Sequence, residues 1–308
     1  MPVQTPLPKW PTLKLEREYE GRVCGVDEAG CAPLAGPVVA AAVVLPAGPK
    51  PRKLRGLTDS KLLPAHQREH YFGIIQQIAQ VGVGLASVGE IERLNIFHAD
   101  MLAMQRAVEA LAKPPDFALV DGRAAPALGC AAKAVVKGDR RSLSIAAASV
   151  VAKVVRDRLM RELAAQHPAY GWHTNAGYGT DVHYLGLLRK GPTEYHRRGF
   201  APLNTLFGPD GPALAEFRFC RLPGKPDVER LKLLELRRDL HAVFDGSGHH
   251  LGVLKKLRGR WTFQAIGYDD EQEPVPAGGP CSGWHGKRLD RPEVRILARL
   301  LAKSPQTG

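Results

Sequence analysis

The sequence predicts an α/β fold, because segments with the pattern of strands alternate with segments that have the pattern of helices. Short apolar runs that end at acidic, glycine or proline residues are typical of strands, and two of them occur at residues 22–26 and 38–45. Apolar residues that recur every three or four positions are typical of helices, and they follow at residues 64–80 and 95–111.

The first elements are predicted to be a hairpin, a helix and a strand. Residues 22–26 and 38–45 flank a Gly- and Pro-rich turn, so we expect them to pair as a hairpin. Residues 81–87 have the pattern of the next strand. Between them, residues 64–80 form a helix whose apolar side chains share one face, namely Tyr71, Ile74, Ile75 and Ile78.

The alternation continues in the middle of the chain. Short strands are expected at residues 118–120 and 134–136, and a long helix at residues 142–165. Thr180 can cap a further helix that runs to Arg189. Before them, the helix at residues 95–111 places a set of apolar side chains on one face: Ile96, Ala99, Ala103, Ala107 and Leu111.

A Pro/Gly cluster at residues 207–212 indicates a linker. We therefore divide the chain into a loose arm (1–20), a main domain (21–207) and a C-terminal extension (208–308), and we expect a chain that ends at Leu206 to fold. In the extension we predict helices at 226–244 and 292–303, a basic hairpin at 254–266 and a Pro/Gly-rich loop at 273–283.

The charge points to a polyanionic partner. Lys and Arg number 43 against 31 Asp and Glu, which gives a net charge of +12 and favours nucleic acid or an anionic membrane surface. A generally basic protein without such a partner is the alternative. No apolar run is long enough to cross a membrane, and the N-terminus has no signal peptide. The five cysteines are scattered and contain no Cys-x-x-Cys, so we expect a cytoplasmic protein without a disulfide framework.

Four carboxylates follow predicted strands. Asp27 and Glu28 end the first strand, Asp121 ends another, and Asp139 follows Gly138 after a third. Acids at the tips of neighbouring strands converge, and divalent metal relieves their repulsion. Oxygen ligands suit Mn²⁺ or Mg²⁺ rather than zinc.

Two consequences depend on this arrangement. Neighbouring residues of a strand point to opposite faces, so Asp27 and Glu28 share a site only if the strand ends or bulges there. Two ions about 4 Å apart would support phosphodiester hydrolysis. A single ion, or a purely structural role for the acids, remains the alternative at this point.

The sequence resembles the bacterial ribonuclease HII (type 2 ribonuclease H) family. The resemblance implies a ribonuclease-H-like mixed sheet flanked by helices, here with a small C-terminal α+β extension. It implies endonucleolytic cleavage of RNA in RNA–DNA hybrids and at ribonucleotides embedded in duplex DNA, which leaves 3′-hydroxyl and 5′-phosphate ends. The matching stretches are GVDEAG…PLAGPVVAAAVVLP (25–46), LTDSK (57–61), IERLNIFHADMLAM (91–104), LVDGR (119–123), KGDRRSLSIAAASVVAKVVRDRLM (137–160), HPAYGW…GYGT (167–180) and HRRGFAPL (196–203).

The resemblance assigns roles to the acids. Asp27, Glu28 and Asp121 match the metal ligands of the family, and Asp139 completes its catalytic set. The substrate is an RNA–DNA hybrid or a ribonucleotide-containing duplex, and we expect the enzyme to act as a monomer without a membrane. The alternatives are a catalytically weakened binder of RNA–DNA duplexes and a nuclease specific for DNA alone.

The resemblance also implies substrate contacts. Tyr178 matches a tyrosine that stacks on the sugar following the ribonucleotide, and Lys61 looks like a phosphate contact. The family's Gly-Arg-Gly triplet, which senses the 2′-hydroxyl through backbone contacts, is here Gly30-Cys31-Ala32. Loss of the arginine removes a fork of donors suited to phosphate, and Ala32 is strained only at positive φ. We therefore expect hydrolysis to persist and discrimination of a single ribonucleotide to be altered.

Several residues have two interpretations. Ser149 and Lys153 lie near the site or belong to helix packing, and His196-Arg197 contact phosphate or cap the last helix. The extension has a further set, Lys255, Lys256, Arg258, Arg260, Trp261 and Phe263, which forms either a basic aromatic surface for nucleic acid or a solvated hairpin face. The spacing of His249, His250, Cys281 and His285 does not favour zinc.

Overall fold

The structure is a computed structural model, and it describes residues 7–49, 51–209 and 211–302. The chain divides into two compact units. The first unit contains the described residues up to His183 together with Pro192–Gly199. The second unit contains Tyr184–Gly191 and the described residues from Phe200 onwards. Each unit has its own sheet.

The first unit contains a mixed sheet of five strands, in the order β3-β2-β1-β4-β5. The first three strands pair antiparallel, and β4 and β5 are added in parallel on the other side of β1. This confirms the predicted mixed sheet. The strands are β1 (Val23–Ala29), β2 (Val38–Val44), β3 (Gln80–Ala86), β4 (Phe117–Asp121) and β5 (Ala131–Val135).

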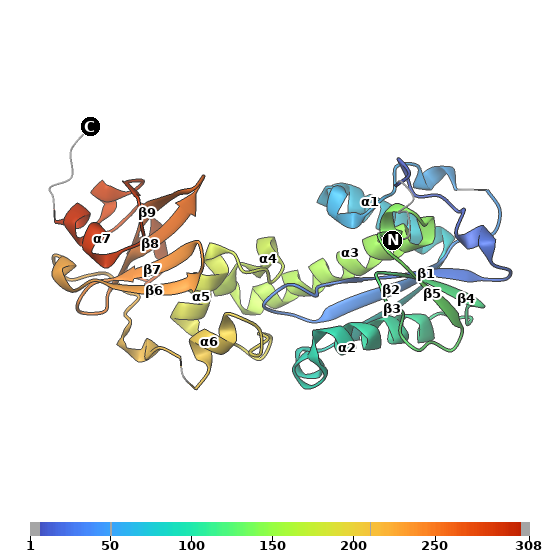
Figure 1. Cartoon of the computed structure of the whole chain (residues 1–308), viewed down its shortest axis with the longest axis horizontal. Coiled ribbons are helices and arrows are strands. Elements are labelled where there is room, and N and C mark those ends of the chain that lie inside the picture. The colour runs from blue at the N-terminus through green and yellow to red at the C-terminus, as the bar shows by residue number, and fades with distance from the viewer. Residues whose placement is uncertain (1–6, 50, 210, 303–308) are drawn as a thin grey trace, which may run out of the picture. The chain divides into compact units, whose positions relative to one another are not determined.

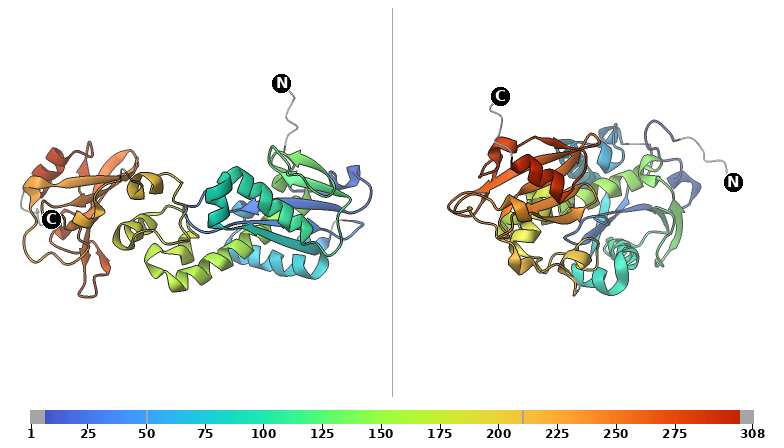
Figure 2. Two further views of the ribbon diagram at one scale, coloured as in Figure 1. Left: turned by 90° about the horizontal axis from the view of Figure 1, so that it is seen from below. Right: turned by 60° about the vertical axis from the view of Figure 1, so that its left-hand side comes forward.

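Helices cover both faces of this sheet. Figure 1 shows α3 (Leu143–Gln166) and α1 (Ala65–Ile78) on one face and α2 (Val88–Glu109) on the other, and the left view of Figure 2 shows α2 from its own side. Every residue of β2 is buried, as expected for a strand covered on both faces. A Cβ at Gly25 would overlap the start of α3, so glycine is required where this helix crosses β1.

Helix α2 is two helices joined at Asn95, where the backbone leaves the helical region (φ 66°, ψ 169°). The Asn95 side chain accepts a hydrogen bond from His98 N at 3.2 Å, so it caps the second helix at the residue where the sequence predicts a start. The helical turns of α2 that precede Asn95 were not predicted from the sequence. They begin with a capping box in which Ser87 and Glu90 satisfy each other's backbone N–H groups.

The prediction of a loose N-terminal arm is wrong for residues 12–18. Thr12 N donates to Arg141 O, and Leu143 N donates to Thr12 O. The Glu16 carboxylate accepts hydrogen bonds from Ser142 Oγ at 2.6 Å and Ser144 N at 2.9 Å. A carboxylate beside a helix N-terminus is stabilised by the helix dipole, so this segment is held against α3.

The second unit contains a sheet of six strands. The predicted helix at 226–244 is wrong, because this region forms a short 3-10 turn and two paired strands. Leu, Lys, Glu and Arg favour helix locally, and pairing with neighbouring strands overrides that preference. The strands are β6 (Lys232–Arg237), β7 (Leu240–Phe244), β8 (His250–Leu257), β9 (Arg260–Tyr268), β10 (Pro274–Pro276) and β11 (Arg288–Leu289).

The remaining helices complete both units. They are α4 (Trp172–Asn175), α5 (Asp181–Lys190), α6 (Leu203–Phe207) and α7 (Val294–Leu301). The predicted C-terminal helix is confirmed as α7, whose Leu297 and Leu301 are buried in the core of the second unit. In the part of the chain that the structure describes, none of these helices has the length and hydropathy that spanning a bilayer requires.

Candidate active site

Three segments of the first unit bring the predicted acids together. Asp27 and Glu28 are consecutive residues of β1, and Asp121 is the last residue of the adjacent parallel strand β4. Asp139 lies in the 3-10 turn Gly138–Arg140 just before α3. Asp121 Oδ1 accepts a hydrogen bond from Gly138 N at 2.6 Å, which ties that turn to the end of β4.

From the sequence we expected β1 to end or bulge at Asp27 and Glu28 if both acids share a site. The strand does neither. It continues to Ala29, and its pairing with β2 is regular, with Asp27 opposite Ala41 and Glu28 opposite Ala40. Asp27 therefore faces α3, where Ser149 hydrogen-bonds to it. Glu28 faces the other side, where Cys31 Sγ is 4.0 Å from its Oε1. Both acids interact with Asp121 because β4 stops beside them.

Burial and mutual repulsion raise the pKa of these acids. Burial raises the pKa of Asp27, and the carboxylates of Glu28 and Asp121 raise it further. The pKa of Glu28 is raised by burial and then by Asp121. The pKa of Asp139 is raised to about 7 by burial, Asp121 and Asp59. The ionised acids are unfavourable together without a cation.

The donor set fits hard divalent ions. Carboxylate oxygens are the ligands that Mg²⁺ and Mn²⁺ prefer, and the raised pKa values indicate a negative charge that a cation would stabilise. Among the described residues, no three of the four acids place oxygens within 4.8 Å of one another. A bound cation would offset the repulsion between these like charges and draw the side chains together.

Lys61 lies against the acid cluster. It follows Asp59, whose carboxylate accepts a hydrogen bond from Lys61 N at 2.8 Å. Burial lowers the pKa of Lys61, but Asp59, Asp27 and Asp139 raise it by more, so the ammonium group stays charged. Nearby, Ser149 Oγ donates to Ser60 Oγ at 2.9 Å, so Ser149 is beside the site as well as in the helix.

Arg197 holds the Gly30-Cys31-Ala32 loop, and neither interpretation of His196-Arg197 from the sequence is correct. The buried guanidinium donates to Gly30 O at 2.6 Å, Cys31 O at 2.9 Å and Gly36 O at 2.8 Å. His196 is buried too, with its Nε2 3.0 Å from His183 Nε2. Their residue types suggested surface contacts, whereas their burial makes them supports of the loop.

The backbone φ angles of the loop suit the residues Gly30 and Ala32. Gly30 has a φ of +106°, and a Cβ there would overlap Arg156 Nε, so this position demands glycine. Ala32 is not among the residues with positive φ, so alanine introduces no backbone strain there.

Arg156 connects the loop to the segment that carries Tyr178. Its guanidinium donates to Pro37 O at 3.0 Å, Ala35 O at 3.0 Å and Ala176 O at 2.9 Å. The Tyr178 side chain is 42% exposed, which leaves its ring available to a ligand. Lys153 Nζ lies 6.0 Å from the centre of this ring, so the predicted Lys153 is near Tyr178.

Sequence reasoning missed Asp100. It lies in α2 beside Glu28 and Cys31, and burial and Glu28 raise its pKa to about 8. The signal was present in the sequence, because Asp100 lies four residues after Ile96 and three before Ala103, on the predicted apolar face of the helix. A carboxylate on an apolar helix face is unusual and indicates a polar environment.

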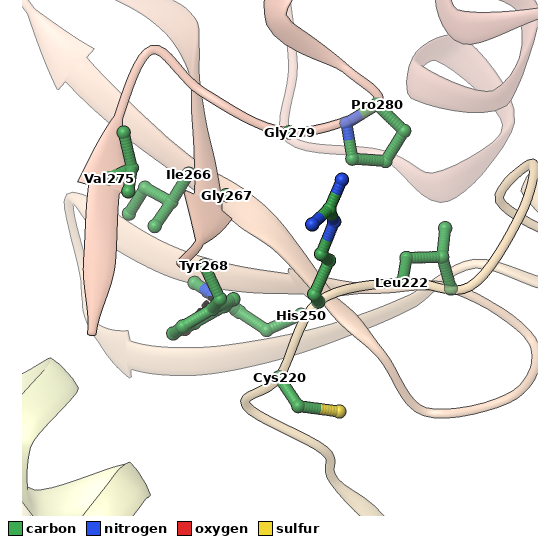
Figure 3. Close-up of a pocket in the computed structure, with 10 residues that line it drawn as sticks. Cys220, Leu222, His250, Ile266, Gly267, Tyr268, Val275, Gly279 and Pro280 are labelled. Carbon is green, nitrogen blue, oxygen red and sulfur yellow. Dashed lines mark hydrogen bonds between the residues drawn. The ribbon is translucent and has the colours of Figure 1, made fainter. Parts of the chain in front are cut away.

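The second unit contains a cavity of about 380 Å³. Figure 3 shows its labelled lining residues, among them His250 and Tyr268, whose hydroxyl lies 2.8 Å from His250 Nδ1. Burial lowers the pKa of His250 to about 3, so the imidazole is neutral. Among the described residues that line this cavity none is acidic, so it does not resemble the acid cluster of the first unit.

Of the two interpretations of the basic hairpin in the extension, the aromatic surface is wrong. Trp261 and Phe263 are only 7% and 0% exposed and belong to the core of the second unit. The basic residues at the β8–β9 turn are exposed: Lys256, Arg258 and Arg260. The hairpin itself is confirmed, and its turn, which carries these basic residues and Leu257, faces solvent.

The pKa shifts predict how metal affects stability. Asp139 has a folded pKa of about 7 against an ordinary value of 3.8, so between these values the folded state holds a proton that the unfolded state has lost. Stability of the metal-free protein therefore falls as the pH rises through this range. We expect Mg²⁺ to raise Tm more at about pH 8 than at about pH 5.5, because the ionised acids bind it.

Thermal unfolding at both pH values, with Mg²⁺ and with a chelator, measures this effect. The variant Asp139→Asn lacks the titrating group and should show a weaker pH dependence. An equal Mg²⁺-induced change in Tm at the two pH values would contradict the assignment.

The segment that contains these site residues is similar to known proteins. The family model described as Ribonuclease HII matches residues 24–203, which contain all four acids and the loop. A protein named Ribonuclease HII from Granulibacter bethesdensis is 57% identical over 199 residues, which cover 64% of this chain and 91% of that relative. One from Jannaschia sp. is 55% identical over 194 residues, which cover 63% and 96%.

A solved structure is also similar. The crystal structure of ribonuclease H2 from Pyrococcus horikoshii OT3 has a TM-score of 0.52 and 26% identity, over 59% of this chain and 95% of that one. The family match ends at residue 203, before most of the second unit.

Proposed function

The chain belongs to the ribonuclease HII family, and we propose that Asp27, Glu28, Asp121 and Asp139 form the centre with which it cleaves RNA. As an endoribonuclease of this family, it cleaves RNA in RNA–DNA hybrids and at ribonucleotides embedded in duplex DNA. The observation that carries the proposal is the convergence of β1, β4 and the Gly138–Arg140 turn on one group of buried carboxylates.

The acids hold Mn²⁺ or Mg²⁺ in this proposal. Asp27, Glu28 and Asp121 supply the ligands, and Asp139 completes the cluster. Two bound ions would activate the attacking water and stabilise the leaving oxygen, which leaves 3′-hydroxyl and 5′-phosphate ends. The protein positions the substrate, because Lys61 brings a positive charge to the cluster for the phosphate next to the cleaved bond.

The loop and Tyr178 select the ribonucleotide. The backbone of Gly30-Cys31-Ala32 contacts the 2′-hydroxyl, and the exposed Tyr178 ring stacks on the following sugar. Arg197 fixes the loop, and Arg156 fixes its distance from the segment before Tyr178. Cys31 offers no guanidinium to the phosphate, so the contribution of this loop to affinity is smaller than that of a Gly-Arg-Gly loop.

A cleavage assay tests the function. We expect the full chain with Mn²⁺ or Mg²⁺ to cut a labelled RNA–DNA hybrid and a DNA duplex with one ribonucleotide, and to leave an all-DNA duplex intact. Binding without cleavage would support the alternative of a duplex-binding protein. Cleavage of the all-DNA duplex would indicate a nuclease of different specificity.

We also propose that the basic edge of the β8–β9 hairpin contacts the nucleic acid backbone. Lys256, Arg258 and Arg260 are exposed at one turn. Truncation at Leu206 is a poor test, because it removes partners of residues that remain: Arg237 lies 5.6 Å from the Tyr184 ring, and Arg189 pairs with Glu273 at 2.8 Å. Charge reversal on the hairpin leaves these interactions in place.

The triple variant Lys256→Glu, Arg258→Glu, Arg260→Glu should bind duplex more weakly. The slope of log affinity against log salt should decrease by about 1 for each phosphate that the variant no longer neutralises. Binding is measured with Asp121→Asn present, so that the duplex is not cut. The control Arg295→Glu, Arg299→Glu changes exposed charges on α7 and should leave the slope unchanged. An unchanged slope in the hairpin variant would exclude this surface.

A further inference from the structure

A thiol lies between two carboxylates on the α2 side of β1. The Cys31 Sγ atom is 4.0 Å from Glu28 Oε1. One ligand atom from each of Glu28, Cys31 and Asp100 lies within 4.8 Å of the other two. All three side chains are partly buried, and they come from β1, the loop after it and α2. No set of three among the four catalytic acids is as compact in the described residues.

Asp100 has an unsatisfied atom in this group. Its Oδ1 is buried and has no hydrogen-bond partner among the residues that the structure describes. A buried carboxylate oxygen without a donor destabilises the folded state unless a cation or a proton satisfies it. Cys31 hydrogen-bonds to the Asp100 carboxylate but not through this oxygen, so a cation held by the group would satisfy it.

The donor set differs from that of the catalytic acids. Mg²⁺ and Mn²⁺ prefer oxygen ligands alone, whereas a thiolate selects ions such as Zn²⁺. Zinc sites with three protein ligands leave a fourth position open. Bonds of about 2.0–2.3 Å in a tetrahedral site place the ligand atoms about 3.5 Å apart. Side-chain rotations that close the present spacings by about 1 Å would therefore form the site.

We propose that Glu28, Cys31 and Asp100 form a separate site for a thiophilic divalent ion such as Zn²⁺, which competes with the catalytic centre for Glu28. The competition rests on the proposed role of Glu28 in catalysis. An ion in this site draws the Glu28 carboxylate toward Cys31 and α2, away from Asp121. Zn²⁺ therefore inhibits Mg²⁺-dependent cleavage.

Cobalt reports the thiolate directly. Co²⁺ bound through sulfur gives a charge-transfer band in the near ultraviolet, and Co²⁺ bound to the catalytic carboxylates gives none. The metal-free full chain is titrated with Co²⁺ in the presence of a non-thiol reductant. We expect one equivalent to produce the band in the wild-type protein.

The variants assign the band to this site. Cys31→Ser and Cys31→Ala should abolish it, and Asp100→Asn should weaken Co²⁺ affinity by at least about tenfold. Cys220→Ser is the matched control, since it removes another partly exposed free cysteine, and it should keep the band. Circular dichroism establishes that each variant is folded. Absence of the band in the wild type, or its persistence in both Cys31 variants, overturns the proposal.

Cleavage of a hybrid under increasing Zn²⁺ tests the competition. The inhibitory Zn²⁺ concentration, measured relative to each protein's own rate without zinc, should rise at least about tenfold in Asp100→Asn. An unchanged inhibitory concentration overturns the competition for Glu28. A band without any cleavage would refute the proposed function but not the site, and cleavage without a band would refute the site but not the function.

Discussion

Replacement of Asp121 by asparagine should abolish most of the RNA cleavage while duplex binding persists. Asparagine keeps the shape of the side chain and the oxygen that accepts from Gly138 N, so the turn before α3 remains in place. It removes the charge that interacts with both Asp27 and Glu28. Loss of a metal ligand at a phosphoryl-transfer centre should lower kcat by orders of magnitude, about 10³-fold or more.

Single-turnover cleavage of a labelled hybrid, with a parallel binding measurement, tests this expectation. Asp116→Asn is the matched control, because Asp116 is an exposed acid before β4 that pairs with Arg22 outside the cluster. The control should cleave at nearly the wild-type rate. Turnover by Asp121→Asn close to wild type, in both Mg²⁺ and Mn²⁺, would remove this residue from the catalytic centre.

The second large effect is expected at Arg197. Arg197→Met removes the donors to the carbonyl groups of Gly30, Cys31 and Gly36, all on the loop after β1. A buried carbonyl without a donor costs about 1–3 kcal/mol, and these three are buried or partly buried, so the free energy of unfolding should fall by about 3 kcal/mol. Arg197→Lys keeps a positive charge but lacks the planar set of guanidinium N–H donors, so it should recover only part of the stability.

A positioning role has a kinetic consequence that a structural role lacks. If the loop senses the 2′-hydroxyl as proposed, cleavage at a single embedded ribonucleotide depends on it, and Arg197→Lys should lower kcat/KM on that substrate more than on a long hybrid. Arg198→Met is the control, because Arg198 is the exposed neighbour. Equal losses on the two substrates would show that Arg197 stabilises the fold without positioning the loop.

The predictable parts of the fold are those with strong local patterns. Every residue of β2 is buried, so its apolar run is uninterrupted. The apolar residues of α1 pack against one core cluster, so they recur with the period of a helix. Asp121 was found for a similar reason, since a buried strand that stops at an acid is rare. Asp139 lies in a turn beyond the mostly exposed strand β5, so the resemblance of its Lys-Gly-Asp motif identified it more than strand burial did.

The parts that sequence reasoning missed depend on partners distant in the chain. Glu16 is bound by Ser142 and Ser144, and Arg197 by the carbonyls of the Gly30 loop, and nothing near these residues in the sequence indicates either interaction. The strands β6 and β7 carry helix-favouring residues and are strands because β8 pairs with β7. Asp100 is different, because its position on an apolar helix face is a local signal in the sequence.

Diffraction from Mn²⁺-soaked crystals tests the central claim most directly, since anomalous scattering locates the ions. The account predicts the strongest peaks about 2.0–2.2 Å from carboxylate oxygens of Asp27, Glu28 and Asp121. Crystals of Asp121→Asn should lose or weaken these peaks. Strong Mn²⁺ peaks elsewhere in the chain, with none among these carboxylates, would contradict the assignment of the catalytic centre.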